Sequence, residues 1–218
     1  MTSVGLAPPG YFERWYAERD WTDYRGLLAR VIELARPGPI LDVGAGAGFF
    51  VEAAHRWGMP CTGLEGSPEG LAAARARFPE LDMREQRLEH PFSLPDAHFE
   101  VALLNQVVEH LAVNDARLAL NEVRRVLRPG GILLVYSPSR FNRIEAEADP
   151  THRHLYSPRE LARLLSEIGF VDIEASDAPL PLLGRTRLRF GLMRVLFKLW
   201  PVERLSATAN CVARNPGA

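Results

Sequence analysis

Short hydrophobic runs alternate with amphipathic stretches along most of the chain. A run of about four to eight apolar residues predicts a buried strand, and apolar residues spaced three or four apart predict a helix. The expected strands are Ile40–Val43, Cys61–Glu65, Leu81–Gln86, Phe99–Asn105, Ile132–Ser137, Val171–Ala175 and Ala207–Arg214. The expected helices are Tyr11–Leu34, Phe49–Trp57, Pro68–Phe78, Asp115–Leu127 and Arg159–Ile168, with Ser67, Asn114 and Ser157 as caps.

This alternation favours an α/β fold, a doubly wound, mostly parallel seven-stranded sheet with helices on both faces. A length of 218 residues fits one domain over 1–218, with a helical lead-in over 1–37 and a core over 38–177. Ligands of such sheets bind at the carboxyl ends of the strands. The informative residues are therefore those just after Val43, Leu64, Gln86, Leu104 and Ser137.

Composition narrows the classes of function. The formal net charge is −1, which argues against a nucleic-acid partner, because such partners need a large positive excess. Cys61 and Cys211 are far apart and are the only cysteines, so neither a disulfide framework nor a thiolate metal cluster is expected. We expect a cytoplasmic protein without a signal peptide or transmembrane segment.

A glycine-rich turn follows the first strand. Gly44, Gly46 and Gly48 alternate between that strand and the next helix, which allows a tight turn and close approach of a ligand to the helix N-terminus. Phe49 stands where the dinucleotide-binding fingerprint has its third glycine. The loop is therefore a weaker match to a site that binds the pyrophosphate of a dinucleotide. Glu65 ends the next strand, where an acidic side chain can accept hydrogen bonds from ribose hydroxyls.

Three segments carry a resemblance to a known family. They are Ile40-Leu41-Asp42-Val43-Gly44-Ala45-Gly46-Ala47-Gly48, Gly63-Leu64-Glu65-Gly66-Ser67 and Leu127-Arg128-Pro129-Gly130-Gly131. They resemble motifs of the class I S-adenosylmethionine-dependent methyltransferases. Val107-Val108-Glu109-His110-Leu111 is similar to the branch that includes ubiquinone-biosynthesis and other small-molecule enzymes. The resemblance covers about residues 38–177.

The resemblance implies which residues bind S-adenosylmethionine. Gly44, Gly46 and Gly48 would contact its methionyl part, Asp42 would organise the loop, and Glu65, in the second motif with Gly66, would hold the ribose. Leu88 would lie beside the adenine and Asn105 near the amino-acid moiety. Arg87 stands where relatives usually have an acidic residue, so adenine recognition would pass to Gln86 or to backbone groups.

Methyl transfer from a sulfonium needs mainly alignment and a dry site, and a general base helps when the acceptor is a hydroxyl. His110 and His152 are the candidate catalytic residues, because both follow strands on the rim where substrate is expected. A structural role for each is the alternative. Some similar methyltransferases bind a divalent ion through Glu-x-x-Glu-His and a distant His. Here Gln106 replaces the first Glu, and no metal is expected.

Residues 178–206 form a basic insertion before the last strand, with a charge of about +5 over 185–204. If residues 188–200 are helical, two apolar stripes lie side by side. The alternatives for this insertion are packing on the core or over the acceptor pocket, a homodimer contact in place of a monomer, and membrane-surface contact through residues 185–200.

Together these features predict a methyltransferase that moves a methyl group from S-adenosylmethionine to a small-molecule acceptor, with oxygen as the favoured nucleophile. The alternatives are a protein or RNA methyltransferase and a non-catalytic partner that binds the cofactor. Balanced charge argues against the macromolecular acceptors.

Overall fold

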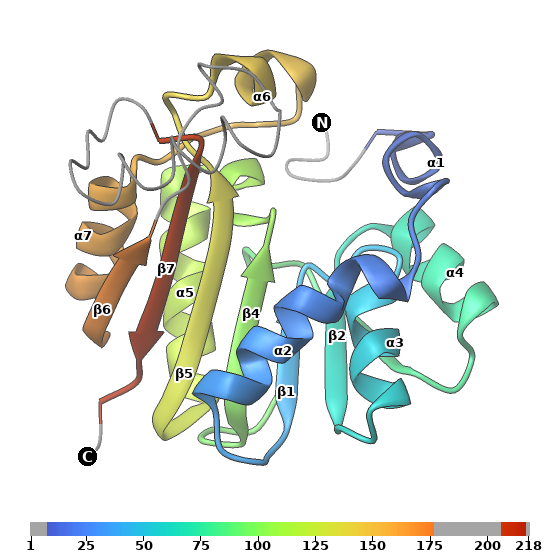
Figure 1. Cartoon of the computed structure of the whole chain (residues 1–218), viewed down its shortest axis with the longest axis horizontal. Coiled ribbons are helices and arrows are strands. Elements are labelled where there is room, and N and C mark those ends of the chain that lie inside the picture. Colours follow the sequence, from blue (N-terminus) through green and yellow to red (C-terminus); the bar gives the residue numbers. More distant parts are fainter. Residues whose placement is uncertain (1–7, 177–205, 217–218) are drawn as a thin grey trace, which may run out of the picture.

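The structure, a computed structural model, describes residues 8–176 and 206–216. In this part of the chain seven strands form one sheet in the order β3-β2-β1-β4-β5-β7-β6 (Figure 1). The strands are β1 Ile40–Val43, β2 Cys61–Glu65, β3 Asp82–Glu85, β4 Phe99–Asn105, β5 Leu127–Pro138, β6 Val171–Ser176 and β7 Thr208–Arg214.

Strands β1 to β5 pair in parallel, and β7 inserts antiparallel between β5 and β6. The chain order reverses between β1 and β4, because β2 and β3 lie on one side of β1 while β4 and β5 lie on the other. The expected doubly wound, mostly parallel seven-stranded sheet is confirmed. Ligands bind such a sheet where the order reverses, at the carboxyl ends of β1 and β4.

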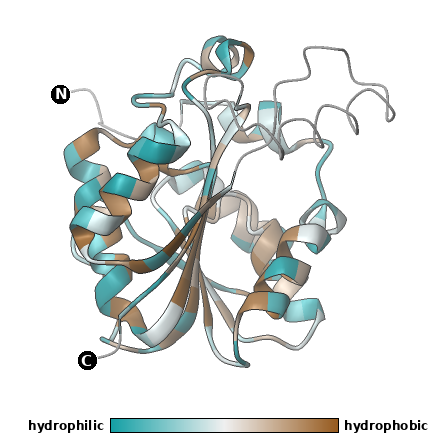
Figure 2. Cartoon of the chain, turned by 60° about the vertical axis from the view of Figure 1, so that its left-hand side comes forward, coloured by the Kyte–Doolittle hydropathy of each residue, from teal (hydrophilic) through white to brown (hydrophobic). Residues whose placement is uncertain are grey.

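Helices flank the sheet on both sides (Figure 2). Two core clusters show which helices cover which face: α2 and α3 pack on one face, and α5 and α7 on the other. The helical elements are α1 Tyr11–Tyr16, η1 Trp21–Tyr24, α2 Arg25–Leu34, α3 Phe49–Arg56, α4 Pro68–Arg77, η2 Val108–His110, α5 Val113–Val126, α6 Arg143–Ala148 and α7 Pro158–Ile168.

The continuous apolar run of strand β4 places buried side chains on both faces of the sheet. Leu103 packs in the cluster that contains Leu28, whereas the next residue, Leu104, packs in the cluster that contains Leu161. Both β4 leucines are fully buried. Successive side chains of a strand point to opposite faces, so a strand covered on both sides has to be apolar throughout.

Two local predictions are wrong. The lead-in is not one helix over 11–34, because the chain breaks after α1: Asp20 is extended and forms a capping box with Asp23, which starts η1. Asn114 does not cap α5, because this helix begins at Val113, two residues before the expected start, and its N-cap residue is Ala112. Ser67 and Ser157 do cap α4 and α7 as expected. The short elements α6 and η2 were not expected.

Both α1 and α6 lie at the end of the sheet to which β4 and β5 point (Figure 1). Among the described residues, no helix is long and apolar enough to cross a membrane. Most of the basic insertion predicted over 178–206 lies outside the described residues.

Candidate functional site

The glycine loop, residues 44–48, connects β1 to α3 at the carboxyl end of the sheet. Gly44, Gly46 and Gly48 have φ values of 77°, 54° and 81°, a region that side chains other than glycine enter at a cost. The backbone amides of Gly44 and Ala45 both donate to the carbonyl oxygen of Leu64, at 2.8 Å. The loop is therefore tied to the end of β2.

Glu65 fastens the middle of this loop. Its two carboxylate oxygens accept hydrogen bonds from the backbone amides of Gly46, at 2.7 Å, and Ser67, at 2.6 Å. Burial raises the pKa of Glu65, and these backbone donors oppose the rise. An ionised carboxylate has about four lone-pair positions, so it can still accept hydrogen bonds from a ligand.

Asp42 lies within β1, directly below the glycine loop, and its side chain is almost completely buried. Burial raises its pKa to about 8, and the nearby charge of Glu65 adds to the rise. The Asp42 carboxyl group is therefore protonated and uncharged at neutral pH.

The other predicted cofactor residues lie around the same end of the sheet. Gly66 follows β2, and a Cβ there would come within 3.2 Å of the carbonyl oxygen of Gln86. Asn105 is the half-buried last residue of β4. Leu88 is buried in the core cluster on the α5 face. Arg87, which stands where relatives usually have an acidic residue, donates to Glu89 at 2.8 Å. The Glu89 carboxylate balances the positive charge of Arg87.

Helix α1 covers the glycine loop, an arrangement that the sequence did not indicate. A Cβ at Gly46 would lie 2.8 Å from the Tyr16 hydroxyl, and a Cβ at Gly70 would lie 2.4 Å from the Phe12 ring. The Tyr16 ring also stacks on Phe49, the first residue of α3, with centroids 6.2 Å apart. The sequence predicted a helical lead-in, but not its contact with the glycine loop.

The structure brings His110 and His152 together, with ring centroids 4.9 Å apart. His110 ends η2, just after β4, and His152 lies in the loop after α6. Two backbone hydrogen bonds hold that loop: the amides of Arg153 and His154 both donate to the carbonyl oxygen of Glu109, at 2.8 and 3.1 Å.

Val107 links this histidine pair to the glycine loop. A Cβ at Gly44 would lie only 2.6 Å from a Val107 methyl group, so the segment that leads into His110 packs directly on the loop. The segment with the candidate catalytic His110 therefore lies beside the glycine loop.

Glu109, His110 and His152 form a cluster whose possible ligand atoms all lie within 4.8 Å of one another. The trio has donors that suit a divalent ion. Burial raises the pKa of Glu109 to about 8 and lowers that of His110 to about 4, so both groups are neutral at pH 7. With Glu109 and His110 both neutral, the cluster does not require a cation, and the expectation of no metal stays a prediction.

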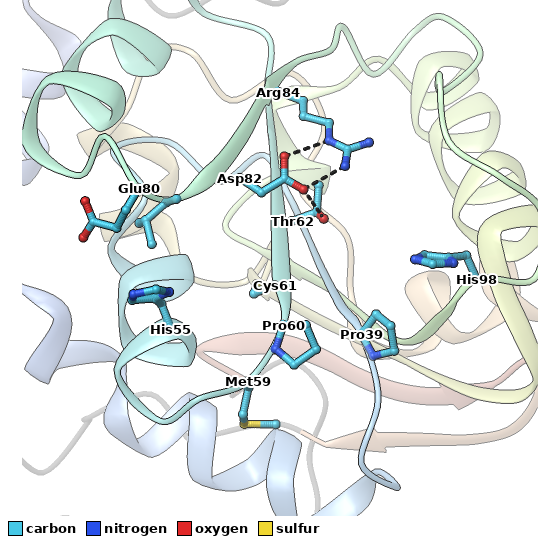
Figure 3. A pocket seen from close by; sticks show the side chains of 11 residues that line it. Pro39, His55, Met59, Pro60, Cys61, Thr62, Glu80, Asp82, Arg84 and His98 are labelled. Carbon is cyan, nitrogen blue, oxygen red and sulfur yellow. Dashed lines mark hydrogen bonds and ion pairs between the residues drawn. The ribbon is translucent and has the colours of Figure 1, made fainter.

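Another hollow, of about 350 Å³, lies at the opposite end of the sheet and is lined by residues from the start of β2 and by β3 (Figure 3). Two of its charged groups pair with each other: Asp82 accepts from Arg84 at 2.8 and 2.9 Å, and also from Thr62 at 2.8 Å. Because ligands of this fold bind at the carboxyl ends of the strands, this hollow is a poor candidate for the site.

Comparison with known proteins identifies the type of domain. A family model described as a methyltransferase domain matches residues 41–135, which include the glycine loop, Glu65 and His110. A probable S-adenosylmethionine-dependent methyltransferase of Mycolicibacterium smegmatis is 34% identical over 172 residues, 78% of this chain and 63% of the relative. The chain belongs to the class I S-adenosylmethionine-dependent methyltransferases.

Two further relatives place this methyltransferase domain in context. A demethylmenaquinone methyltransferase of Tropheryma whipplei is 31% identical over 66% of this chain and 59% of the relative. The crystal structure of a methyltransferase from Archaeoglobus fulgidus shares the fold, with a TM-score of 0.73 and 17% identity over 94% of this chain and 97% of that chain. The chain spans less than two thirds of the length of the curated relatives named here.

Proposed function

We propose that this protein transfers a methyl group from S-adenosylmethionine to a hydroxyl group of a small-molecule acceptor. The observation that carries the proposal is the contact between Gly44 and Val107, which places the glycine loop beside the segment that ends in His110. A methyl donor on the loop and an acceptor at the histidines would then meet across a short gap. Such proximity is the main requirement of a displacement reaction.

The residues of the glycine loop fit the donor. Gly46 has a positive φ and Glu65 is a buried carboxylate with spare acceptor positions, which suits ribose hydroxyls. Gly44 and Gly48 would face the methionyl part, Asp42 would support the loop from below, and the donor itself supplies a methyl group activated by positively charged sulfur. Aromatic rings of α1 over the loop would exclude water from this contact.

A hydroxyl acceptor is favoured by the neutral His110 ring. His110 is held neutral at pH 7 by burial, so it has a lone pair with which to receive a proton. The acceptor loses one proton during O-methylation, and a proton acceptor within the dry site is useful for that step. A small molecule is favoured over a nucleic acid by the net charge of −1.

The proposal is tested by incubating the protein with methyl-labelled S-adenosylmethionine and a fractionated metabolite extract. The expected result is label in one small molecule, attached to oxygen, and its loss in the Glu65→Ala variant. Binding of the donor by calorimetry, without labelled product from any metabolite, protein or RNA fraction, would instead favour a non-catalytic binding protein.

A further inference from the structure

A chain of hydrogen bonds runs from helix α1 to His110. The Tyr11 hydroxyl donates to Asp149 Oδ2 at 2.9 Å, and Asp149 Oδ1 accepts from the Thr151 hydroxyl at 2.5 Å. The same Thr151 Oγ1 lies 2.9 Å from His110 Nδ1. Only the bond between Asp149 and Thr151 joins residues that are close in sequence. The tertiary structure therefore assembles this series of hydrogen bonds.

Thr151 is held in place by its backbone as well. Its amide donates to Asp149 Oδ1 at 2.9 Å, and the next residue, His152, donates its amide to the Asp149 carbonyl oxygen at 3.3 Å. The backbone amide of Arg153 then donates to the backbone carbonyl oxygen of Glu109. The hydroxyl of Thr151 therefore has a fixed position between Asp149 and His110.

The direction of each hydrogen bond follows from the chemistry of the groups. Burial opposes ionisation of Asp149, but hydrogen bonds from Thr151 and Tyr11 hold its pKa below the usual value, so it is a carboxylate that can only accept. The single hydroxyl proton of Thr151 must then point at Asp149. Its oxygen can only accept from His110, which places the proton of the neutral ring on Nδ1 and leaves the Nε2 lone pair free.

His152 has no comparable support. Its Nδ1 is buried without a hydrogen-bond partner among the described residues, so nothing there selects one tautomer of its ring. The groups that face His110 are His152, Glu109, Asp149 and Tyr11. Within the described residues, His110 contacts the Thr151 hydroxyl through Nδ1, which leaves Nε2 to face a bound acceptor.

We propose that His110, through Nε2, receives the proton of the acceptor hydroxyl, and that Thr151 and Asp149 are positioning residues that fix the required Nδ1–H tautomer. This inference rests on the proposed function, because it needs an acceptor with an O–H group. It separates the two histidine candidates, which the sequence could not rank: His110 is the proton acceptor and His152 is its neighbour.

The proton transfer balances the methyl transfer. The acceptor oxygen uses a lone pair to form the new C–O bond, the electrons of the broken C–S bond remain with sulfur, and the hydroxyl proton passes to His110 Nε2. The positive charge that leaves sulfur reappears on the imidazolium ring. The ionised Asp149 stabilises that charge through Thr151, as a buried carboxylate does for a catalytic histidine. The O–H group becomes strongly acidic as the C–O bond forms, so even a ring with a lowered pKa suffices.

The tautomer can be measured without any acceptor. In nitrogen NMR of histidine-labelled protein at pH 7, protonated and unprotonated ring nitrogens have well-separated shifts. We expect His110 to be mainly Nδ1–H, the opposite of the preference of a free histidine side chain. Thr151→Val, which removes the hydroxyl but keeps the shape, should restore the Nε2–H form, and Thr151→Ser should retain Nδ1–H.

A matched control lies at the other end of the sheet. Thr62 also donates to a carboxylate, Asp82, at 2.8 Å, so Thr62→Val loses an equivalent bond (Figure 3). That variant should leave the His110 shifts unchanged. A His110 that is mainly Nε2–H in the unaltered protein overturns the inference, as does an unchanged tautomer in a folded Thr151→Val variant.

Turnover gives the second readout, with the acceptor found by the labelling experiment. Thr151→Val should lower kcat about 10- to 100-fold and leave the dissociation constant of S-adenosylmethionine unchanged, while Thr151→Ser should restore most of the rate. Equal rates for the two variants would contradict the positioning role. If the Nδ1–H tautomer is found but no methyl transfer occurs, the proposed function fails while the assigned hydrogen-bond directions stand.

Discussion

The Glu65 carboxylate accepts a hydrogen bond from the backbone amide of Gly46 at 2.7 Å, and this bond spans nineteen residues of sequence. It crosses from the end of β2 to the middle of the glycine loop and is buried. The loop is therefore held in its turned conformation by the chain itself. A site that is organised before the ligand arrives loses less entropy on binding.

Glu65→Ala should weaken S-adenosylmethionine binding by about 1–3 kcal/mol, because the variant loses both the loop anchor and the acceptor for ribose hydroxyls. Titration calorimetry measures the change. Glu85→Ala is the control, because Glu85 is the exposed register partner of Glu65 on β3. Equal affinity of the Glu65 variant and the unaltered protein would contradict the assignment of Glu65.

Gly46→Ala should destabilise the fold by more than the cost of a positive φ, which is about 1–2 kcal/mol. The added Cβ would lie 2.8 Å from the Tyr16 hydroxyl. Gly58→Ala is the matched control, because Gly58 also has a positive φ, 68°, but has no atom near its Cβ position. Urea unfolding should therefore show a larger loss for Gly46→Ala than for Gly58→Ala.

The Tyr16 hydroxyl is the nearest atom to that Cβ position, so removing it should relieve part of the loss. Adding Tyr16→Phe to Gly46→Ala should recover stability in a double-mutant cycle. If the two changes are simply additive, α1 does not pack on the glycine loop as described.

Asp42 should make the protein less stable as the pH rises. Burial raises its folded-state pKa to about 8, above the unfolded value of about 3.9, so the folded state holds the proton more tightly. Its contribution is fully present below about pH 4 and is lost as the pH rises through 8. One pKa unit corresponds to about 1.4 kcal/mol, so the loss between pH 5 and pH 8 should exceed that value.

Asp42→Asn should make this loss of stability smaller, because the amide is neutral throughout, while Glu109, whose pKa is also raised to about 8, keeps its own contribution. Urea unfolding at pH 5 and pH 8 provides the measurement. Asp82→Asn is the control: hydrogen bonding lowers the pKa of Asp82, so its effect falls at acidic pH, outside this window. A loss between pH 5 and pH 8 that is as large in the Asp42 variant as in the unaltered protein would contradict the assignment to Asp42.

The parts of the structure that local sequence determines were predictable. Gly44, Gly46 and Gly48 are required by positive φ angles, and Ser157 caps a helix through its own side chain and Glu160. Each of these signals involves residues a few positions apart. The break after α1 depends on Asp20 and Asp23, a local signal that the prediction of one long helix over 11–34 overlooked.

The parts that depend on distant contacts were not predictable. The neighbourhood of His110 and Thr151 requires backbone hydrogen bonds from residues 153 and 154 to Glu109. No periodicity or motif indicates such a bond, because the backbone amide is the same in nearly every residue type. The same holds for the contact of Tyr16 with Gly46, since hydrophobic pattern shows that a ring is buried but not against what.

The cluster of Glu109, His110 and His152 should work without a metal ion. Within the part of the chain that the structure describes, neither Glu109 carboxyl oxygen has a hydrogen-bond partner, and the nearby Ser137 hydroxyl donates to the Pro138 carbonyl oxygen at 3.2 Å. Burial keeps the Glu109 carboxyl protonated at pH 7, with a pKa of about 8. The uncharged Glu109→Gln variant should therefore be as stable as the unaltered protein at pH 7.

Chelation tests the same expectation directly. EDTA should leave the melting temperature and the methyl-transfer rate unchanged, and elemental analysis of the purified protein should find no stoichiometric divalent ion. A bound ion would stabilise the folded state by mass action. A melting temperature that falls on chelation, and that no longer responds to EDTA in the Glu109→Gln variant, would show that these three side chains hold a metal after all.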